Sequence, residues 1–143
     1  MIIGKKIKMS QIFTDENVVP VTLVNVDNSA AAGEFKIGEQ IKVSGISKGK
    51  GFQGVVKRHG FGGGPKTHGQ KNRMRAPGSI GPTHPQRIFP GRKMAGRMGG
   101  QKITLKKSFI VDWNKETGIL ALRGALPGAP GSKIKIYLSE DKK

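Results

Sequence analysis

The sequence predicts an all-β protein, a small six-stranded barrel interrupted by a long, irregular, basic and glycine-rich loop. Short runs of β-branched residues separated by turn residues lie toward both ends of the chain. Between them, 72 consecutive residues (40–111) contain no Asp or Glu, but hold 16 of the 26 Lys and Arg and 15 of the 22 Gly. The length of 143 residues suits one ordinary domain, or a smaller one with a long appendage.

The first predicted element is a hairpin near the N-terminus. Residues 7–13 and 18–26 are rich in β-branched side chains, and the short polar side chains of 14–17 favour a turn between them. Pro20 cannot donate a hydrogen bond to a sheet, so we expect it at an edge or a bulge of the second strand.

Four further strands are predicted at the two ends of the acid-free stretch and after it. Residues 41–44 and 133–138 alternate between apolar and polar side chains, as half-buried strands do. Residues 109–113 and 119–123 flank a loop of hairpin length that ends in Gly118, and Phe109 and Trp113 are expected in the barrel core or at its rim. Closure of six short strands into a barrel would remove exposed sheet edges.

The central segment has a different composition. Residues 59–102 include seven Val, Ile, Leu, Met, Phe or Trp, against eleven Gly and nine Lys or Arg. Such a segment cannot bury a core of its own. We therefore expect residues 59–100 to form an extended loop that a partner orders, and residues 1–58 and 101–143 to form the barrel. Residues 51–58 could form a short helix, although Gly54 weakens that prediction.

The charge distribution indicates a polyanionic partner. The net charge is +17, of which +16 comes from residues 40–111, and self-repulsion makes such an excess costly in isolation. Gly and Pro interrupt every candidate for a membrane-binding amphipathic helix, and there is no long basic helix or zinc-finger pattern for DNA. An irregular basic segment can instead bring Arg, Lys and backbone N–H groups against phosphates between RNA helices. Folded RNA is the predicted partner, with no membrane and no small-molecule substrate.

Cysteine and hydropathy indicate the compartment. The chain has no Cys, which excludes disulfides and thiolate metal sites. Its apolar runs are far shorter than a membrane span, and the N-terminus does not resemble a signal peptide. We expect a cytoplasmic protein.

Motifs that suggest enzymes are incomplete. Residues 49–54 match the glycine pattern of dinucleotide-binding loops, but no acid follows until Asp112, so a nucleotide-binding enzyme is the weaker alternative. In residues 63–67, Pro65 replaces the glycine that a phosphate loop requires. The three His lie in a segment without acids or thiols that could complete a zinc site. We predict no catalytic residue, no metal and no cofactor.

Five ordered blocks resemble the universal large-subunit ribosomal protein L-three family in its bacterial form. They are residues 3–13, 43–54, 77–81, 91–96 and 124–128. The resemblance implies a six-stranded barrel like those of translation factors, on the surface of the large subunit, and neighbouring ribosomal proteins as further partners. It also implies that the loop runs through large-subunit ribosomal RNA toward the peptidyl-transferase centre, and that early, direct RNA binding helps to nucleate assembly.

The same resemblance and the charge map assign the RNA-binding residues. Residues 47–52 and 56–58 match the start of the family's loop, and residues 78–81 match the segment near its inner tip. Arg can bind phosphate in bidentate fashion and Lys as a point charge, and the His can stack on bases or contact phosphate. The expected set is Lys48, Lys50, Lys57, Arg58, His59, Lys66, His68, Lys71, Arg73, Arg75, His84, Arg87, Arg92, Lys93 and Arg97.

Two departures from the family pattern stand out. Residues 27–34 form a short linker of mostly small residues where bacterial relatives usually carry a partly helical insert. Pro82 follows Gly81 where many bacterial relatives have a Gln that becomes methylated, and His84-Pro85 resembles the archaeal and eukaryotic pattern. We expect a resident structural protein of the large subunit without catalytic activity. A translation or assembly factor that binds transiently through the same barrel is the alternative.

Overall fold

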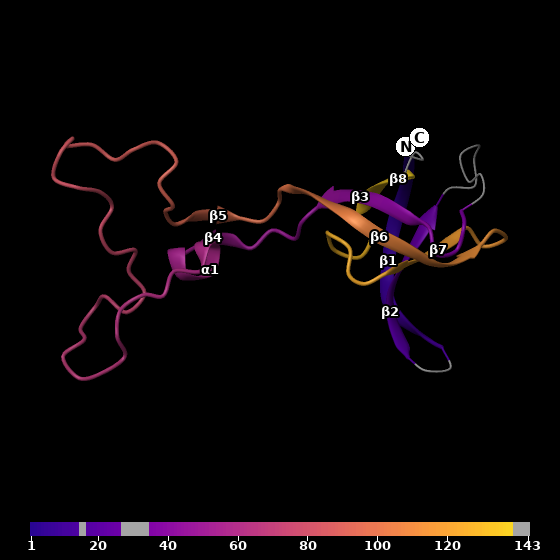
Figure 1. Ribbon diagram of the computed structural model, residues 1–143, viewed down its shortest axis with the longest axis horizontal. Helices are drawn as coiled ribbons and strands as arrows, with labels where there is room; N and C mark the ends of the chain where they lie inside the picture. Colours follow the sequence, from indigo (N-terminus) through magenta and orange to yellow (C-terminus); the bar gives the residue numbers. More distant parts are fainter. Residues whose placement is uncertain (15–16, 27–34, 139–143) are drawn as a thin grey trace. The chain divides into compact units, whose positions relative to one another are not determined.

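A computed structural model of the chain describes residues 1–14, 17–26 and 35–138. The chain divides into two units, Met1–Lys48 with Gly100–Lys143, and Gly49–Gly99. Within the described residues all regular structure is β-strand apart from one five-residue helix, which confirms the all-β class (Figure 1). The elements are β1 (Ile2–Phe13), β2 (Val18–Val26), β3 (Gln40–Ile46), β4 (Gly51–Gln53), α1 (Val55–His59), β5 (Gly96–Met98), β6 (Lys102–Asn114), β7 (Ile119–Arg123) and β8 (Lys133–Leu138).

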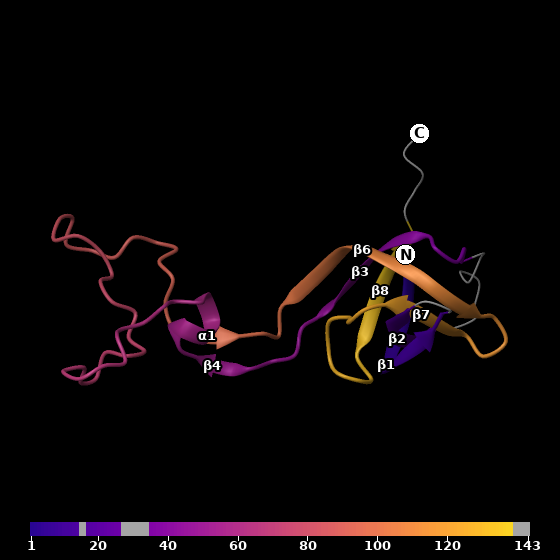
Figure 2. The same cartoon turned by 60° about the horizontal axis from the view of Figure 1, so that its bottom comes forward.

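The first unit is a six-stranded antiparallel sheet that closes on itself. Its strands hydrogen-bond in the order β1-β2-β7-β6-β3-β8, and β8 pairs in turn with β1, through Ile2 opposite Ile136 and Lys5 opposite Lys133 (Figures 1 and 2). The β1–β2 and β6–β7 pairs are the two predicted hairpins. In the second hairpin, the Asn114 side chain accepts hydrogen bonds from the backbone N–H groups of Glu116 and Thr117.

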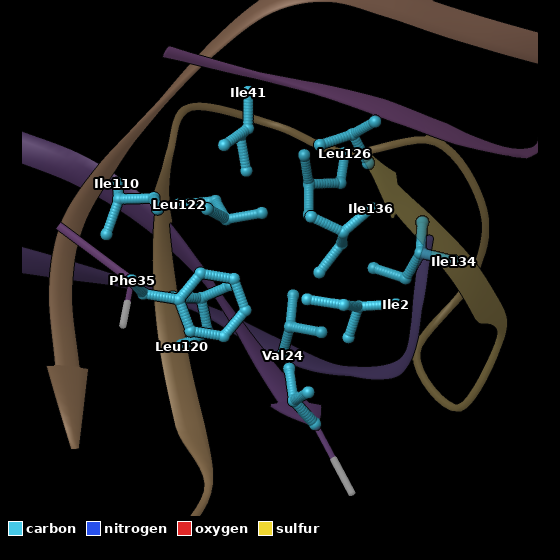
Figure 3. Close-up of a cluster of buried hydrophobic side chains, with 12 residues drawn as sticks. Ile2, Val24, Phe35, Ile41, Ile110, Leu120, Leu122, Leu126, Ile134 and Ile136 are labelled. Atoms are coloured by element: carbon cyan, nitrogen blue, oxygen red, sulfur yellow. The ribbon is translucent and has the colours of Figure 1, made fainter. Parts of the chain in front are cut away.

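Alternation along the strands produces the core. In β8, Ile134 and Ile136 point inward and are fully buried, whereas Lys133 and Lys135, which alternate with them, are exposed. Figure 3 shows these isoleucines among the apolar side chains contributed by the other strands of the barrel. Burial of each such side chain stabilises the fold by about 1.5–3 kcal/mol. The core therefore explains why these six strands hold together. Its members are Ile2, Val24, Val26, Phe35, Ile41, Val43, Ile110, Leu120, Leu122, Leu126, Ile134 and Ile136.

One lysine points into the barrel and fastens the loop that precedes β8. Lys6 is 7 % exposed, and its ammonium group donates hydrogen bonds to the carbonyl oxygens of Leu126 at 2.8 Å and Gly128 at 3.0 Å. The backbone N–H of Lys6 also donates to the carbonyl of Ser132 at 3.0 Å. Burial lowers the pKa of Lys6, and the positive charge of Lys48 lowers it further. These hydrogen bonds thus offset the free-energy cost of burying a charged ammonium group in the core.

The aromatic residues assigned to the core or rim have different environments. Trp113 is partly buried and packs edge-on against Phe35, with ring centroids 4.9 Å apart and an interplanar angle of 72°. Phe109 is 38 % exposed, so it is not a core residue. Pro20 lies beyond the β2–β7 ladder, which begins at Val21, as expected for a residue that cannot donate. The predicted linker at residues 27–34 lies outside the described residues.

The second unit contains a two-stranded sheet and the helix. β4 pairs antiparallel with β5, with Phe52 opposite Arg97. The predicted helix at 51–58 is instead a strand followed by α1, because Gly54 is extended and caps the helix rather than extending it. Gly60 ends α1 in the left-handed conformation that glycine adopts at little cost (φ +74°). β5 is not among the predicted strands. Residues 49–58 belong to this unit, whereas the sequence-based division groups them with the strands of the barrel.

Candidate nucleic-acid interface

The unit Gly49–Gly99 presents a dense and exclusively positive surface. It contains eleven Lys and Arg and no Asp or Glu. Of the fifteen residues expected to bind RNA, all but Arg58 and His59 are exposed. The exposed members are Lys48, which directly precedes this unit, and Lys50, Lys57, Lys66, His68, Lys71, Arg73, Arg75, His84, Arg87, Arg92, Lys93 and Arg97.

Arg58 and His59 have internal partners at the base of this unit. The Arg58 guanidinium donates to the backbone carbonyl of Met94 at 2.6 Å, and His59 Nε2 lies 3.0 Å from the same oxygen. Gly96 leaves room for this arrangement, since a Cβ there would come within 2.8 Å of Arg58 Nη1. These two side chains therefore join α1 to the segment that precedes β5, and they help to fix the shape of the interface.

A second contact closes the first half of the loop. The backbone N–H of Gly64 donates to the carbonyl of Met74 at 3.0 Å. Gly63 has φ +74°, and a Cβ there would lie 2.1 Å from the same carbonyl oxygen, so this approach requires glycine. The contact also fixes the backbone that carries Arg73 and Arg75, the neighbours of Met74 in sequence. The glycines thus determine where these two guanidinium groups are presented.

A hollow of about 960 Å³ lies beside this contact. It combines an aromatic ring, exposed backbone and one guanidinium group, which can contact a base, a phosphate or a ribose. Its lining consists of Phe61, residues 62–65, Arg73 and residues 76–79. Phe61 and Ser79 were not among the predicted site residues, because nothing in the local sequence shows that residues 61–65 and 76–79 meet.

The second half of the loop is held by side-chain contacts to backbone and to one ring. The Arg92 guanidinium donates to the carbonyl of Ser79, which joins two segments 13 residues apart in sequence. The Arg87 guanidinium lies 5.8 Å from the centroid of the Phe89 ring. Arg92 was predicted to bind phosphate, but its bond to Ser79 commits part of its donor capacity within the loop.

The chemistry available at this interface is anion binding. In the described part of the chain, no three His, Asp or Glu side chains gather where they could hold a metal ion. Nor does any helix there reach the length and hydropathy needed to cross a membrane. The unit offers guanidinium and ammonium groups, backbone N–H groups and a few rings, which is the set that recognises ribose-phosphate.

Comparisons with known proteins identify relatives of the chain. Residues 8–121 match the family model described as Ribosomal protein L3. The chain is 54 % identical over 110 residues to the large ribosomal subunit protein uL3 of Chlorobium limicola, a match that covers 76 % of this chain and 53 % of the relative. It is 45 % identical over 131 residues to that of Chloroherpeton thalassium, covering 91 % and 60 % of the two chains. With that of Dehalococcoides mccartyi it is 43 % identical over 127 residues, covering 88 % and 62 %.

The matched part spans less than two thirds of each of these relatives. The family model nevertheless covers most of this chain, and it includes the whole cationic unit. The sequence-based resemblance to this family is therefore confirmed. The chain belongs to the ribosomal protein L3 family.

Proposed function

We propose that this protein is a structural constituent of the large ribosomal subunit that binds large-subunit ribosomal RNA directly and has no catalytic activity of its own. The observation that carries the proposal is an acid-free unit of 51 residues with eleven exposed or half-buried cations, in a chain of the ribosomal protein L3 family. Such a surface repels itself unless an anionic polymer neutralises it. Ribosomal RNA is the polyanion that the family supplies, and the bacterial cytoplasm is the compartment.

We assign a different role to each of the two units. We assign RNA binding to the loop at residues 59–100, supported at its base by Lys48, Lys50 and Lys57. We assign the six barrel strands, which lie within residues 1–58 and 101–143, to a scaffold like the barrels of translation factors. The glycine contacts support this assignment, because they fix the backbone that presents the guanidinium groups of Arg73 and Arg75. From the family resemblance we further propose that the loop runs toward the peptidyl-transferase centre, and that early binding helps to nucleate assembly of the subunit.

Charge removal in the loop tests the assignment. We expect Arg73→Gln, Arg75→Gln and Arg97→Gln together to reduce the slope of log affinity against log salt by about 2 to 3, since each lost phosphate contact contributes about 0.7–0.9. These three side chains are exposed, and Arg92 is left unchanged because it bonds Ser79. The measurement is filter binding of the full chain to large-subunit ribosomal RNA at several salt concentrations.

The control removes the same charge from the other unit. Lys36→Gln, Lys115→Gln and Arg123→Gln change three exposed cations of the unit that contains the sheet. We expect this variant to keep the slope of the wild-type protein. If both triple variants lower the slope equally, binding is governed by net charge alone, and the assignment to the loop is wrong.

Co-sedimentation separates the proposal from its alternative, a factor that binds transiently. A resident protein stays with large subunits through a moderate salt wash, at about one copy for each subunit, because its phosphate contacts are many. Release in that wash, with less than one copy bound before it, would favour the transient factor.

A further inference from the structure

The outer face of the barrel carries a second cationic surface, on β1, β8, β3 and β6. Outward-facing residues of adjacent strands form a first cross-strand row in which Ile3 lies opposite Lys135, and Lys135 opposite Ser44. In a second row, Lys5 lies opposite Lys133 and Ile46 opposite Lys102. Since side chains alternate between the two faces of a strand, both rows lie on the same outer face.

This face is hollowed. One depression of about 300 Å³ and a second of about 330 Å³ share Ile3 and Lys133, so they adjoin one another. Ile3 is 50 % exposed and Ile46 is 61 % exposed, which leaves two large apolar side chains open at the surface. Ser44, the small residue between them, is buried, and its hydroxyl is 2.7 Å from that of Thr104. The surface is thus a shallow apolar floor; its rim consists of Lys5, Lys102, Lys133 and Lys135.

The charge of this face favours an anionic partner. The sequences of β1, β3 and β8 contain no Asp or Glu. The single acid of β6, Asp112, lies opposite Ala121 of β7, beyond the part of β6 that pairs with β3. Four lysines around these two adjoining depressions repel one another unless a polyanion lies across them. A chain of phosphates can neutralise them all, while its sugars and bases pack on Ile3 and Ile46.

We propose that this lysine-rimmed hollow is a second RNA-binding site, distinct in residues from the loop. It holds the sugar-phosphate backbone of one RNA segment, with phosphates on Lys102, Lys133 and Lys135 and a ribose or base against the two isoleucines. The proposal rests on the proposed function, because it assumes that RNA is the partner of the chain. It adds that RNA contacts both units, so that the barrel takes part in recognition as well as supporting the loop.

Lysine acetylation tests the site in the full chain. The protein is labelled alone, in complex with transcribed large-subunit ribosomal RNA, and within the purified large subunit, and each lysine is quantified by mass spectrometry. We expect RNA alone to protect Lys102, Lys133 and Lys135. Lys36 and Lys115, exposed in the same unit, should be labelled in the binary complex as in the free protein.

The outcomes distinguish this proposal from the proposed function. If the three lysines are protected in the subunit but not by RNA alone, another protein covers the hollow, and the inference is wrong. Labelling of the three lysines both in the binary complex and in the subunit would overturn the inference as well. Lys57, Lys66 and Lys71 report on the loop independently. If these loop lysines stay reactive in both complexes, the assignment of RNA binding to the loop fails, whatever the hollow shows.

An affinity measurement gives the second test. Lys102→Gln, Lys133→Gln and Lys135→Gln together should lower the salt slope of RNA binding by about 2 to 3, as expected for three lost phosphate contacts. Added to the loop variant, this change should reduce the slope further by the same amount. An unchanged slope, in a protein whose strands retain the wild-type circular dichroism, would contradict the site.

Discussion

The two units of this chain obtain their shape in different ways. The barrel has a core of twelve buried residues, drawn from all six strands and from segments between them. In the unit Gly49–Gly99, Val55 is the one buried apolar side chain. There the backbone is directed by glycine approaches and by side chains that donate to carbonyls, such as Arg58 to Met94 and Arg92 to Ser79.

This difference has an energetic meaning. Buried apolar surface stabilises a fold whatever the solvent contains, whereas an exposed hydrogen bond contributes about 0.5–1.5 kcal/mol and exchanges readily with water. A few such bonds cannot offset the conformational entropy of 51 residues, each of which costs about 1–2 kcal/mol to order. The contacts within the second unit are therefore too few to stabilise its conformation alone, and under the proposed function RNA supplies the remaining stabilisation.

The largest expected effect is a difference in protease resistance. In the full chain without RNA, we expect trypsin to cut first between residues 60 and 100, while fragments that contain the barrel strands persist. Lys and Arg occur in both units, so the availability of cleavage sites does not decide the order. Local opening of the loop costs little, whereas cutting the barrel requires global unfolding, typically about 5–15 kcal/mol.

Mass spectrometry of the early fragments locates the cuts. Addition of large-subunit ribosomal RNA should slow cleavage between residues 60 and 100 and leave the barrel fragments unchanged. Early cleavage within β7 or β8, at the rate seen in the loop, would remove the distinction between the two units.

A pair of identical substitutions sharpens the comparison. Ile136→Ala removes a fully buried side chain of the barrel, and Ile80→Ala removes one that is 43 % exposed in the other unit. We expect the first to lower the free energy of unfolding by about 2–5 kcal/mol and the second to change it by less than about 0.5 kcal/mol. Trp113, the single Trp of the chain, reports barrel unfolding by fluorescence because it packs on Phe35. Similar losses in the two variants would show that residue 80 belongs to a core.

The barrel could be predicted from the sequence where side-chain alternation is regular. The bounds of β2, β7 and β8 agree with the predicted strands residue for residue. The beginning of β1 was missed, because Gly4 and an inward-facing Lys6 do not resemble strand residues. Gly4 is required there, since a Cβ would lie 2.6 Å from the Val24 side chain. The first half of β6 was missed as well, because Lys106 and Lys107 interrupt the alternation where the β3–β6 register shifts.

The candidate interface could be predicted in composition but not in geometry. The acid-free run and its cations are visible in the sequence, and so is their exposure, since nothing there could bury them. Contacts such as Gly64 with Met74, or the pairing of β4 with β5, depend on which distant segments meet. The hollow on the barrel could not be predicted for a related reason. Lys102 and Lys133 lie in different strands, and only the register brings them to one depression.

The smallest expected effect concerns the same residue type in two environments. Lys6 is buried and bonded to the carbonyls of Leu126 and Gly128, whereas Lys36 of the same unit is exposed. Lys6→Met leaves those two carbonyl oxygens without their donor, so we expect it to destabilise the barrel by about 1–3 kcal/mol at neutral pH. Lys36→Met should change stability by less than about 0.5 kcal/mol. Urea unfolding followed by Trp113 fluorescence measures both.

The pH dependence of the Lys6 effect has a definite sign. Because burial and Lys48 lower the pKa of Lys6 in the folded state, the unfolded chain binds this proton more tightly than the folded chain does. The wild-type protein therefore gains stability from this group as the pH rises from its depressed pKa toward the ordinary lysine value of about 10.4. The Met variant lacks that gain, so the stability difference between the two proteins should widen as the pH rises toward about 10.4. If it narrows instead, the contacts with Leu126 and Gly128 hold the charged ammonium more strongly than burial disfavours it.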